Sequence, residues 1–146
     1  MPFLKELQSR YKNITYHNKT HAADLAQTFY YFCITGDLKT KCNLDPIEMF
    51  SYVLAGACHD VEHPGVSNIF LIESNDKIAL NYNDSAVLEN HHVATAFQIL
   101  HRKDFNILKN FSKPDYKRIR KLMVDAILAT DMAQHFNKFT QFKNTI

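Results

Sequence analysis

The sequence predicts an all-α domain, and three observations carry that prediction. Apolar residues recur at the three- and four-residue spacing of amphipathic helices, whereas the alternation typical of β-strands is scarce. Only three of the 146 residues are glycine, so the apolar segments contain few breaks. Helix start signals stand ahead of these segments. We expect helices near residues 3–11, 20–34, 46–59, 67–73, 85–101, 114–129 and 132–142.

The first long apolar segments differ in how clearly their ends are marked. The stripe of the segment 20–34 consists of Leu25, Phe29 and Phe32. A turn at Gly36 ends that segment, and a loop is expected from 36 to 44. The next helix has a capping aspartate at Asp45, proline at its first position and glutamate at its third. Its stripe consists of Ile47, Phe50, Val53, Leu54, Ala57 and Cys58.

The later helices follow a proline-glycine turn at residues 64–65. Ser112 and Asp115, with Pro114 between them, form a second and weaker start signal. The stripe of the helix that follows consists of Ile119, Leu122, Met123, Ala126 and Ile127. Asp131 stands where it can cap the last helix, and we favour that structural interpretation over a catalytic one.

Composition limits the classes of function. The net charge of +2 gives no reason to expect a nucleic-acid polymer as partner. Three cysteines argue against a disulfide framework, and Cys33 and Cys58 lie in apolar segments as buried thiols do. We therefore expect a reducing, cytoplasmic environment. No apolar run approaches the ~20 residues of a transmembrane helix, and the first residues lack a signal-peptide pattern.

Six of the eight histidines lie in three short polar motifs beside these helices. His17 and His21 are four residues apart, so they share a face if one helix contains both. Alternatively, Asn18 caps the helix and leaves His17 just outside it. On its own, His21 is equally well explained as a core histidine at the head of an apolar stripe.

The pair His59-Asp60 ends a strongly apolar helix, where an unpaired charge is costly. Imidazole and carboxylate are ligands for zinc, manganese or iron. The metal interpretation is favoured once His17 and His21 are considered with this pair. His63 follows one turn after His59, close enough to support such a site.

Glu89, His91 and His92 interrupt an otherwise amphipathic segment. They are either solvent-facing or directed at the metal cavity. In the second case Glu89 is able to orient an imidazole by accepting its free N–H.

In this order the motifs closely resemble the catalytic domain of class I cyclic-nucleotide phosphodiesterases, which belong to the HD metal-hydrolase superfamily. The resemblance covers about Tyr16 to Phe136. It rests on His-Asn-x-x-His-Ala-x-Asp at 17–24, His-Asp-x-x-His-Pro-Gly-x-x-Asn at 59–68, Tyr-Asn-Asp at 82–84, Val-Leu-Glu-Asn-His-His at 87–92 and Ala-Thr-Asp-Met at 129–132. Such enzymes are all-helical, which agrees with the periodicity.

The resemblance implies two divalent metals and a set of roles. By resemblance, His21, His59 and Asp60 are ligands of a zinc ion, and Asp60 also reaches a magnesium or manganese ion. His17 is the implied general acid. His63 and Glu89 are implied to hydrogen-bond around the ions, with Glu89 orienting the acid. The implied substrate-binding residues are Tyr16, Asn68, Thr130 and Met132.

The resemblance also implies ligands that this chain does not contain. Family members take a further aspartate ligand, a glutamine and an aromatic clamp from helices that would follow Ile146. Residues 1–146 are therefore expected to be the amino-terminal portion of a catalytic domain, inactive alone and incomplete at the C-terminus. Phe136, Phe139 and Phe142 would then lack cover, and self-association through them is expected.

The implied function is hydrolysis of cAMP, cGMP or both to 5′-nucleoside monophosphates in cyclic-nucleotide signalling. Preference between the two is not readable, because the base-holding residues lie outside the chain. Two alternatives stay open: another HD-type phosphohydrolase, and a non-catalytic helical module. The full motif set argues against the first, and the intact histidines argue against the second.

Overall fold

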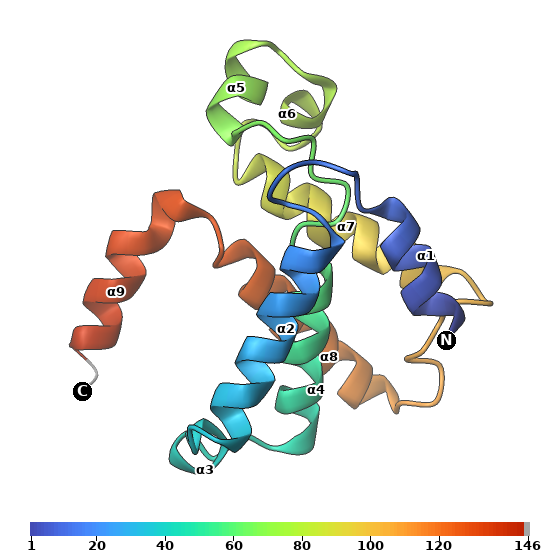
Figure 1. Cartoon of the computed structure of the whole chain (residues 1–146), viewed down its shortest axis with the longest axis vertical. Coiled ribbons are helices and arrows are strands. Elements are labelled where there is room, and N and C mark those ends of the chain that lie inside the picture. Colours follow the sequence, from blue (N-terminus) through green and yellow to red (C-terminus); the bar gives the residue numbers. More distant parts are fainter. Residues whose placement is uncertain (145–146) are drawn as a thin grey trace.

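The computed structural model describes residues 1–144, and every regular element in that range is a helix, which confirms the predicted all-α class (Figure 1). The elements in chain order are α1 (Pro2–Arg10), α2 (Lys19–Ile34), α3 (Leu38–Lys41), α4 (Pro46–Cys58), α5 (Asn68–Glu73), α6 (Lys77–Asn81), α7 (Val87–His101), α8 (Lys113–Leu128), the 3₁₀ helix η1 (Met132–Gln134) and α9 (His135–Lys143).

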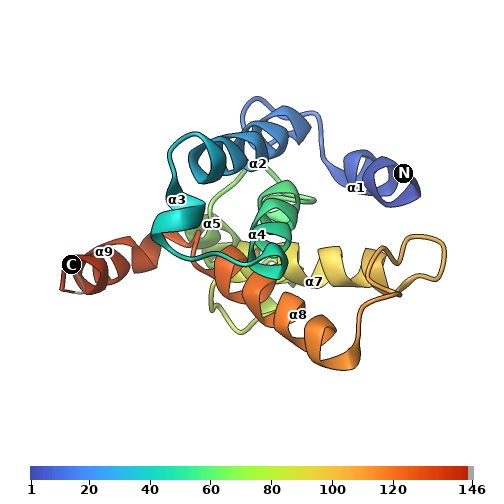
Figure 2. The same cartoon turned by 90° about the horizontal axis from the view of Figure 1, so that it is seen from below.

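Helix α4 is central to the fold. It packs against α2 and α8, and Figure 2 shows it between them. The stripe of α8 forms much of the core, since Ile119, Met123 and Ile127 are fully buried. Helix α7 packs against α8 and α1, and the core extends to Phe3 of α1. This arrangement fixes the ends of α2, α4 and α7 near one another.

The predicted helix starts are confirmed by side-chain caps. Asp45 accepts hydrogen bonds from the backbone of Ile47 and Glu48, and the Glu48 carboxylate accepts one from the Asp45 backbone. Asn18 caps α2 through the backbone N–H groups of residues 20 and 21. Ser112 caps α8 in the same way. Each cap satisfies donors that an isolated helix leaves unpaired.

The structure differs from the sequence expectations in three places. The expected loop 36–44 contains the short helix α3, which follows Asp37 in the left-handed region at φ 58°. Helix α6 was not expected; it is capped by Asp76 and buries only Ala79. The single helix expected at 132–142 is split into η1 and α9. Elements this short contain too few turns to display an apolar period.

Apolar side chains are exposed to solvent on two helices, α2 and α9. The expected α2 stripe is not buried throughout: Phe32 is 55% exposed, while Ala22 and Cys33 carry the buried positions. Helix α9 projects away from α2 (Figures 1 and 2). Its Phe136, Phe139 and Phe142 are all exposed. No helix within residues 1–144 combines the length and apolar character that a membrane span requires.

Gly56 sets how closely α2 and α4 approach. A Cβ atom at this position would lie 2.8 Å from Cδ2 of Leu25 and 3.2 Å from Cα of Ala26. The Leu25 side chain is able to rotate, but the Ala26 backbone moves only if α2 moves. Because α2 carries His21 and α4 leads to His59, this contact also sets the distance between the two imidazoles.

We predict that Gly56→Val lowers the free energy of unfolding by about 1–3 kcal/mol, because the added atoms overpack the helix contact. Thr28→Val, a β-branched substitution on the exposed face of α2, is the matched control and should change stability by less than about 0.5 kcal/mol. Urea unfolding followed by circular dichroism measures both. Equal stability of the two variants would contradict the proposed close approach.

Candidate metal centre

Three helix ends converge on one group of polar side chains. His21 lies in the first turn of α2, directly after the Asn18 cap. His59 is the residue that ends α4, and Asp60 follows it. His92 enters from α7. The apolar run of α4 buries the end of that helix, so His59 and Asp60 are only 5% and 8% exposed.

The structure brings His21, His59 and Asp60 together although 38 residues separate the two histidines. The two Nε2 atoms are 3.2 Å apart. Oδ2 of Asp60 lies 3.3 Å from Nε2 of His21 and 3.0 Å from Nε2 of His59. Ligand atoms of a tetrahedral zinc with bonds of ~2.0–2.1 Å are roughly 3.3 Å apart, so the triangle has the dimensions of such a site.

The hydrogen bonds around this triangle leave lone pairs facing one another. Nδ1 of His59 donates to the carbonyl oxygen of Gly56 at 2.8 Å, so Nε2 of the neutral ring is unprotonated. Oδ2 of Asp60 is buried and has no aligned hydrogen-bond donor among the described residues, despite the nearby imidazoles. Nε2 of His59 and Oδ2 of Asp60 both present lone pairs, and Nε2 of His21 lies within 3.3 Å of each. A cation relieves the repulsion between such lone pairs, so these residues fit a divalent metal.

The electrostatics of the triangle agree with this. Burial and the neighbouring His59 lower the pKa of His21. Burial alone would lower the pKa of His59 and raise that of Asp60, but their mutual attraction outweighs it, so the pKa of His59 is raised and that of Asp60 lowered. The Asp60 carboxylate is thus ionised, and a nearby cation would stabilise it.

A second group shares Asp60 and adds His63 and His92. Nδ1 of His92 donates to the carbonyl oxygen of Val61 at 2.7 Å, and its Nε2 lies 3.9 Å from Oδ1 of Asp60. Nδ1 of His63 accepts from the backbone N–H of Gly65 at 2.9 Å. Burial lowers the pKa of His92 to about 3 and that of His63 to about 4, so both rings are neutral at pH 7.

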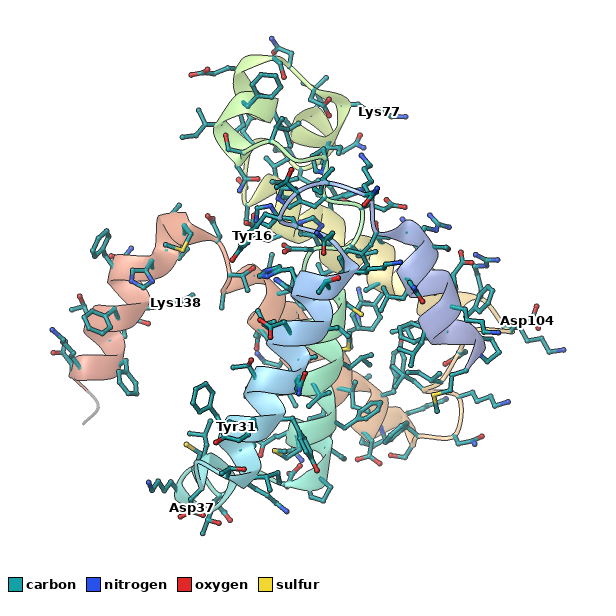
Figure 3. The ribbon with its side chains drawn as sticks, viewed as in Figure 1. Tyr16, Tyr31, Asp37, Lys77, Asp104 and Lys138 are labelled. Carbon is teal, nitrogen blue, oxygen red and sulfur yellow. The ribbon has the colours of Figure 1, made fainter. Side chains whose placement is uncertain are left out.

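His17 lies outside the α2 helix and does not belong to either group. Its ring stacks on His63, with centroids 4.0 Å apart and an interplanar angle of 9°. Tyr16 contacts both His17 and His21 with its ring and is 64% exposed. Figure 3 shows Tyr16 beside one end of α2 and Tyr31 toward the opposite end of that helix.

Glu89 and Asn68 form a separate contact at the edge of the site. Oε2 of Glu89 accepts from Nδ2 of Asn68 at 2.9 Å, and Oδ1 of Asn68 accepts from the backbone N–H of Leu88 at the same distance. The structure therefore ties α5 to the start of α7. The hydrogen bond that is recorded for the Glu89 side chain goes to an amide, so its expected role in orienting an imidazole stays a prediction.

An open cavity of about 760 Å³ lies in front of these residues. Thr130 and Met132 line it from the segment after α8. The Thr130 hydroxyl donates to the carbonyl oxygen of Ile127 at 2.7 Å, and Met132 is 71% exposed. Asp131 also borders the cavity, and its side chain caps η1 through the N–H of Ala133 as expected.

Two charged residues of the site were not identified from the sequence. Glu62 lies between Asp60 and His63 and accepts from Nη1 of Arg10 at 2.7 Å and from Nε2 of His91 at 2.9 Å. His91 is thus neither solvent-facing nor in the metal groups. Glu62 could have been identified from its position inside the His-Asp-Val-Glu-His motif. No sequence pattern pointed to Arg10.

Comparisons with known proteins agree on one family. The family model for 3′5′-cyclic nucleotide phosphodiesterase matches residues 16–146. Over 144 residues the chain is 40% identical to the probable 3′,5′-cyclic-AMP phosphodiesterase pde-4 of Caenorhabditis elegans, a match that covers 99% of this chain and 21% of that protein. The chain thus spans about a fifth of the length of this curated relative.

Solved structures give the same result. The phosphodiesterase domain of the RhoPDE fusion protein from the choanoflagellate Salpingoeca rosetta superposes with a TM-score of 0.89 at 32% identity. A second structure of the phosphodiesterase domain of the rhodopsin phosphodiesterase from that organism gives the same TM-score and identity. These matches cover 98% of this chain and 44% and 43% of the solved chains.

The low pKa of His92 predicts a loss of stability in acid. Its pKa falls from 6.5 to about 3 on folding, so the unfolded chain binds the additional proton between these values. The stabilisation is present above pH 6.5 and is lost as the pH falls. For this residue we expect the free energy of unfolding to drop by about 2 kcal/mol from pH 7 to pH 5 in metal-free protein.

Denaturant titrations at several pH values test this, with two variants for comparison. His92→Asn keeps an N–H for the Val61 carbonyl and removes the titration, so it should lose about 2 kcal/mol less over the same range. His101→Gln, at the exposed end of α7, should follow the parent chain. Identical pH slopes for His92→Asn and the parent chain would show that buried His92 does not titrate as described.

Proposed function

This chain belongs to the 3′,5′-cyclic nucleotide phosphodiesterase family, and on that premise we propose that its protein hydrolyses the cyclic phosphodiester of cAMP or cGMP to the 5′-monophosphate. Family membership implies a cyclic-nucleotide substrate and the use of divalent metals. The observation that carries the proposal is the triangle of His21, His59 and Asp60, whose nitrogen and oxygen atoms have the spacing of metal ligands.

We propose that this triangle holds zinc and that Asp60 also faces a magnesium or manganese ion on the side of His63 and His92. When bound, such ions supply Lewis-acid activation of water and neutralise charge that develops on the phosphoryl group. The protein contributes the fixed tautomer of His59 and the ionised state of Asp60.

His17 is proposed as the general acid that protonates the leaving 3′-oxygen. It lies outside both metal groups and borders the cavity. Its ring stacks on the neutral His63 ring, which orients the imidazole and places no positive charge beside it. A general acid held in this way contributes about 10²–10⁴ in rate.

The remaining cavity residues are proposed to position the nucleotide. Asn68 and Glu89 are held by each other, which fixes one wall of the cavity. Met132 offers exposed apolar surface in the cavity, and Thr130 lines it as well. Tyr16 is exposed and contacts the rings of His17 and His21, which both line the cavity. The free thiols of Cys33 and Cys58 are buried, which supports a proposed cytoplasmic location.

The ligand assignment predicts opposite behaviour for two substitutions. Asp60→Asn should lower zinc affinity by more than 100-fold, because the neutral amide no longer balances the cation. His17→Asn should leave zinc affinity unchanged within about twofold, because His17 acts on the substrate and not on the metal. Titration of zinc against a chromophoric chelator measures both, with Asp131→Asn as the control for loss of a cavity carboxylate. Loss of zinc in His17→Asn would make His17 a ligand.

We further propose that residues 1–146 alone have no phosphodiesterase activity and self-associate. Three protein ligands leave the metal site open, and the exposed Phe136, Phe139 and Phe142 give an apolar surface for a second copy. The purified chain with zinc and magnesium should hydrolyse neither cAMP nor cGMP above the blank, and should sediment as more than a monomer. Metal-dependent turnover by a monomer would contradict this proposal and leave the family assignment intact.

A further inference from the structure

Glu62 is held by three donors from two helices. Its Oε1 accepts from Nη1 of Arg10 at 2.7 Å. Its Oε2 accepts from Nε2 of His91 at 2.9 Å and from the Thr95 hydroxyl at 3.3 Å. Arg10 ends α1, and the other two donors belong to α7. These three hydrogen bonds hold the half-buried Glu62 carboxylate in one orientation.

The backbone of Glu62 is strained. Its φ of 64° lies in the left-handed region, which a residue with a Cβ atom rarely occupies. The residue stands in the tight turn between Asp60 and His63, where the backbone N–H of His63 donates to the carbonyl oxygen of Asp60 at 3.0 Å. The turn directs Asp60 into both metal groups, so relaxation at Glu62 would reorient their shared ligand.

Helix α1 is anchored independently of this turn. Phe3 and Leu7 are buried in the main core. Glu6 accepts from Nε of Arg10 at 3.3 Å and from Nη1 of Arg102 at 2.7 Å. The Arg10 guanidinium therefore links Glu6 of the anchored helix α1 to Glu62. Arg10 precedes the residues that the family model matches, which begin at 16.

We propose that Arg10 and Glu62 are positioning residues for the metal centre, and that α1 sets its metal affinity by holding the strained Asp60–His63 turn. The inference rests on the proposed function, because it requires that the triangle binds a divalent cation. Neither side chain is a member of the two metal groups. Arg10 acts through Glu62, and Glu62 acts through the backbone that carries Asp60.

Arg102 provides a matched control. Arg10 and Arg102 both contact Glu6, and both help to fix α1, but only Arg10 contacts Glu62. We would titrate cobalt(II) chloride into the 146-residue chain and into Arg10→Gln and Arg102→Gln, following the visible absorption of the bound ion. Thermal unfolding of each apo-protein measures the structural cost of the substitution.

Arg10→Gln should bind cobalt 10–100-fold more weakly than the parent chain and should shift the visible spectrum, as expected for a change behind the ligands. Arg102→Gln should bind within about twofold of the parent chain, whatever its melting temperature. Arg10→Lys keeps the charge and one donor, so it should recover most of the affinity. This variant also covers the case in which Arg10→Gln fails to fold.

Three results would overturn the inference. They are parent-like cobalt affinity and spectrum in Arg10→Gln, equal weakening in the two glutamine variants, and no recovery in Arg10→Lys. Equal weakening would mean that loss of α1 packing, and not the contact with Glu62, is responsible. Failure of the parent chain to bind cobalt would instead refute the metal site of the proposed function, on which the inference rests.

Discussion

The structure of the site depends on one unfavourable arrangement: a buried, ionised carboxylate oxygen of Asp60 faces the unprotonated Nε2 of His59, with Nε2 of His21 close to both. Within residues 1–144, no aligned hydrogen-bond donor reaches Oδ2 of Asp60, and Nδ1 of His59 donates its proton to the Gly56 carbonyl oxygen, away from Asp60. Such a cluster persists only where the surrounding fold determines it. Here the determinant is the packing of α2 and α7 around the end of α4.

The arrangement separates the histidines into different chemical roles. Burial keeps His63 and His92 neutral, with pKa values of about 4 and 3, so they add no positive charge beside a cation site. His17 stands outside this group and contacts it through ring stacking on His63. The proposed general acid and the proposed metal site can therefore lie close together, because the neutral His63 ring beside His17 adds no charge of its own.

Much of the fold was predictable from the sequence, because the information was local. The caps at Asp45 and Ser112 gave the starts of two long helices, and the cap at Asn18 was one of two alternatives for the start of a third. The buried stripe of α8 followed from its period. The short helices α3 and α6 were not predictable, since four or five residues show no period and their capping depends on turns in the left-handed region or on one aspartate.

The site divides in the same way. The histidine and aspartate motifs were visible, since they interrupt apolar helices, and the resemblance supplied roles that remain proposals. The contact between Arg10 and Glu62 joins residues 52 positions apart, and that of His91 with Glu62 spans 29. No local pattern reports such pairs. The sequence therefore indicated candidate residues for the chemistry, but not the residues that hold those candidates in place.

The central claim is that His21, His59 and Asp60 bind one metal ion. X-ray absorption at the zinc edge, on protein loaded with one equivalent of zinc, tests it directly. The account predicts two imidazole nitrogens and carboxylate oxygen at roughly 2.0–2.2 Å, with one imidazole lost in His21→Ala. A shell of oxygen atoms without imidazole, or a spectrum unchanged by His21→Ala, would contradict it.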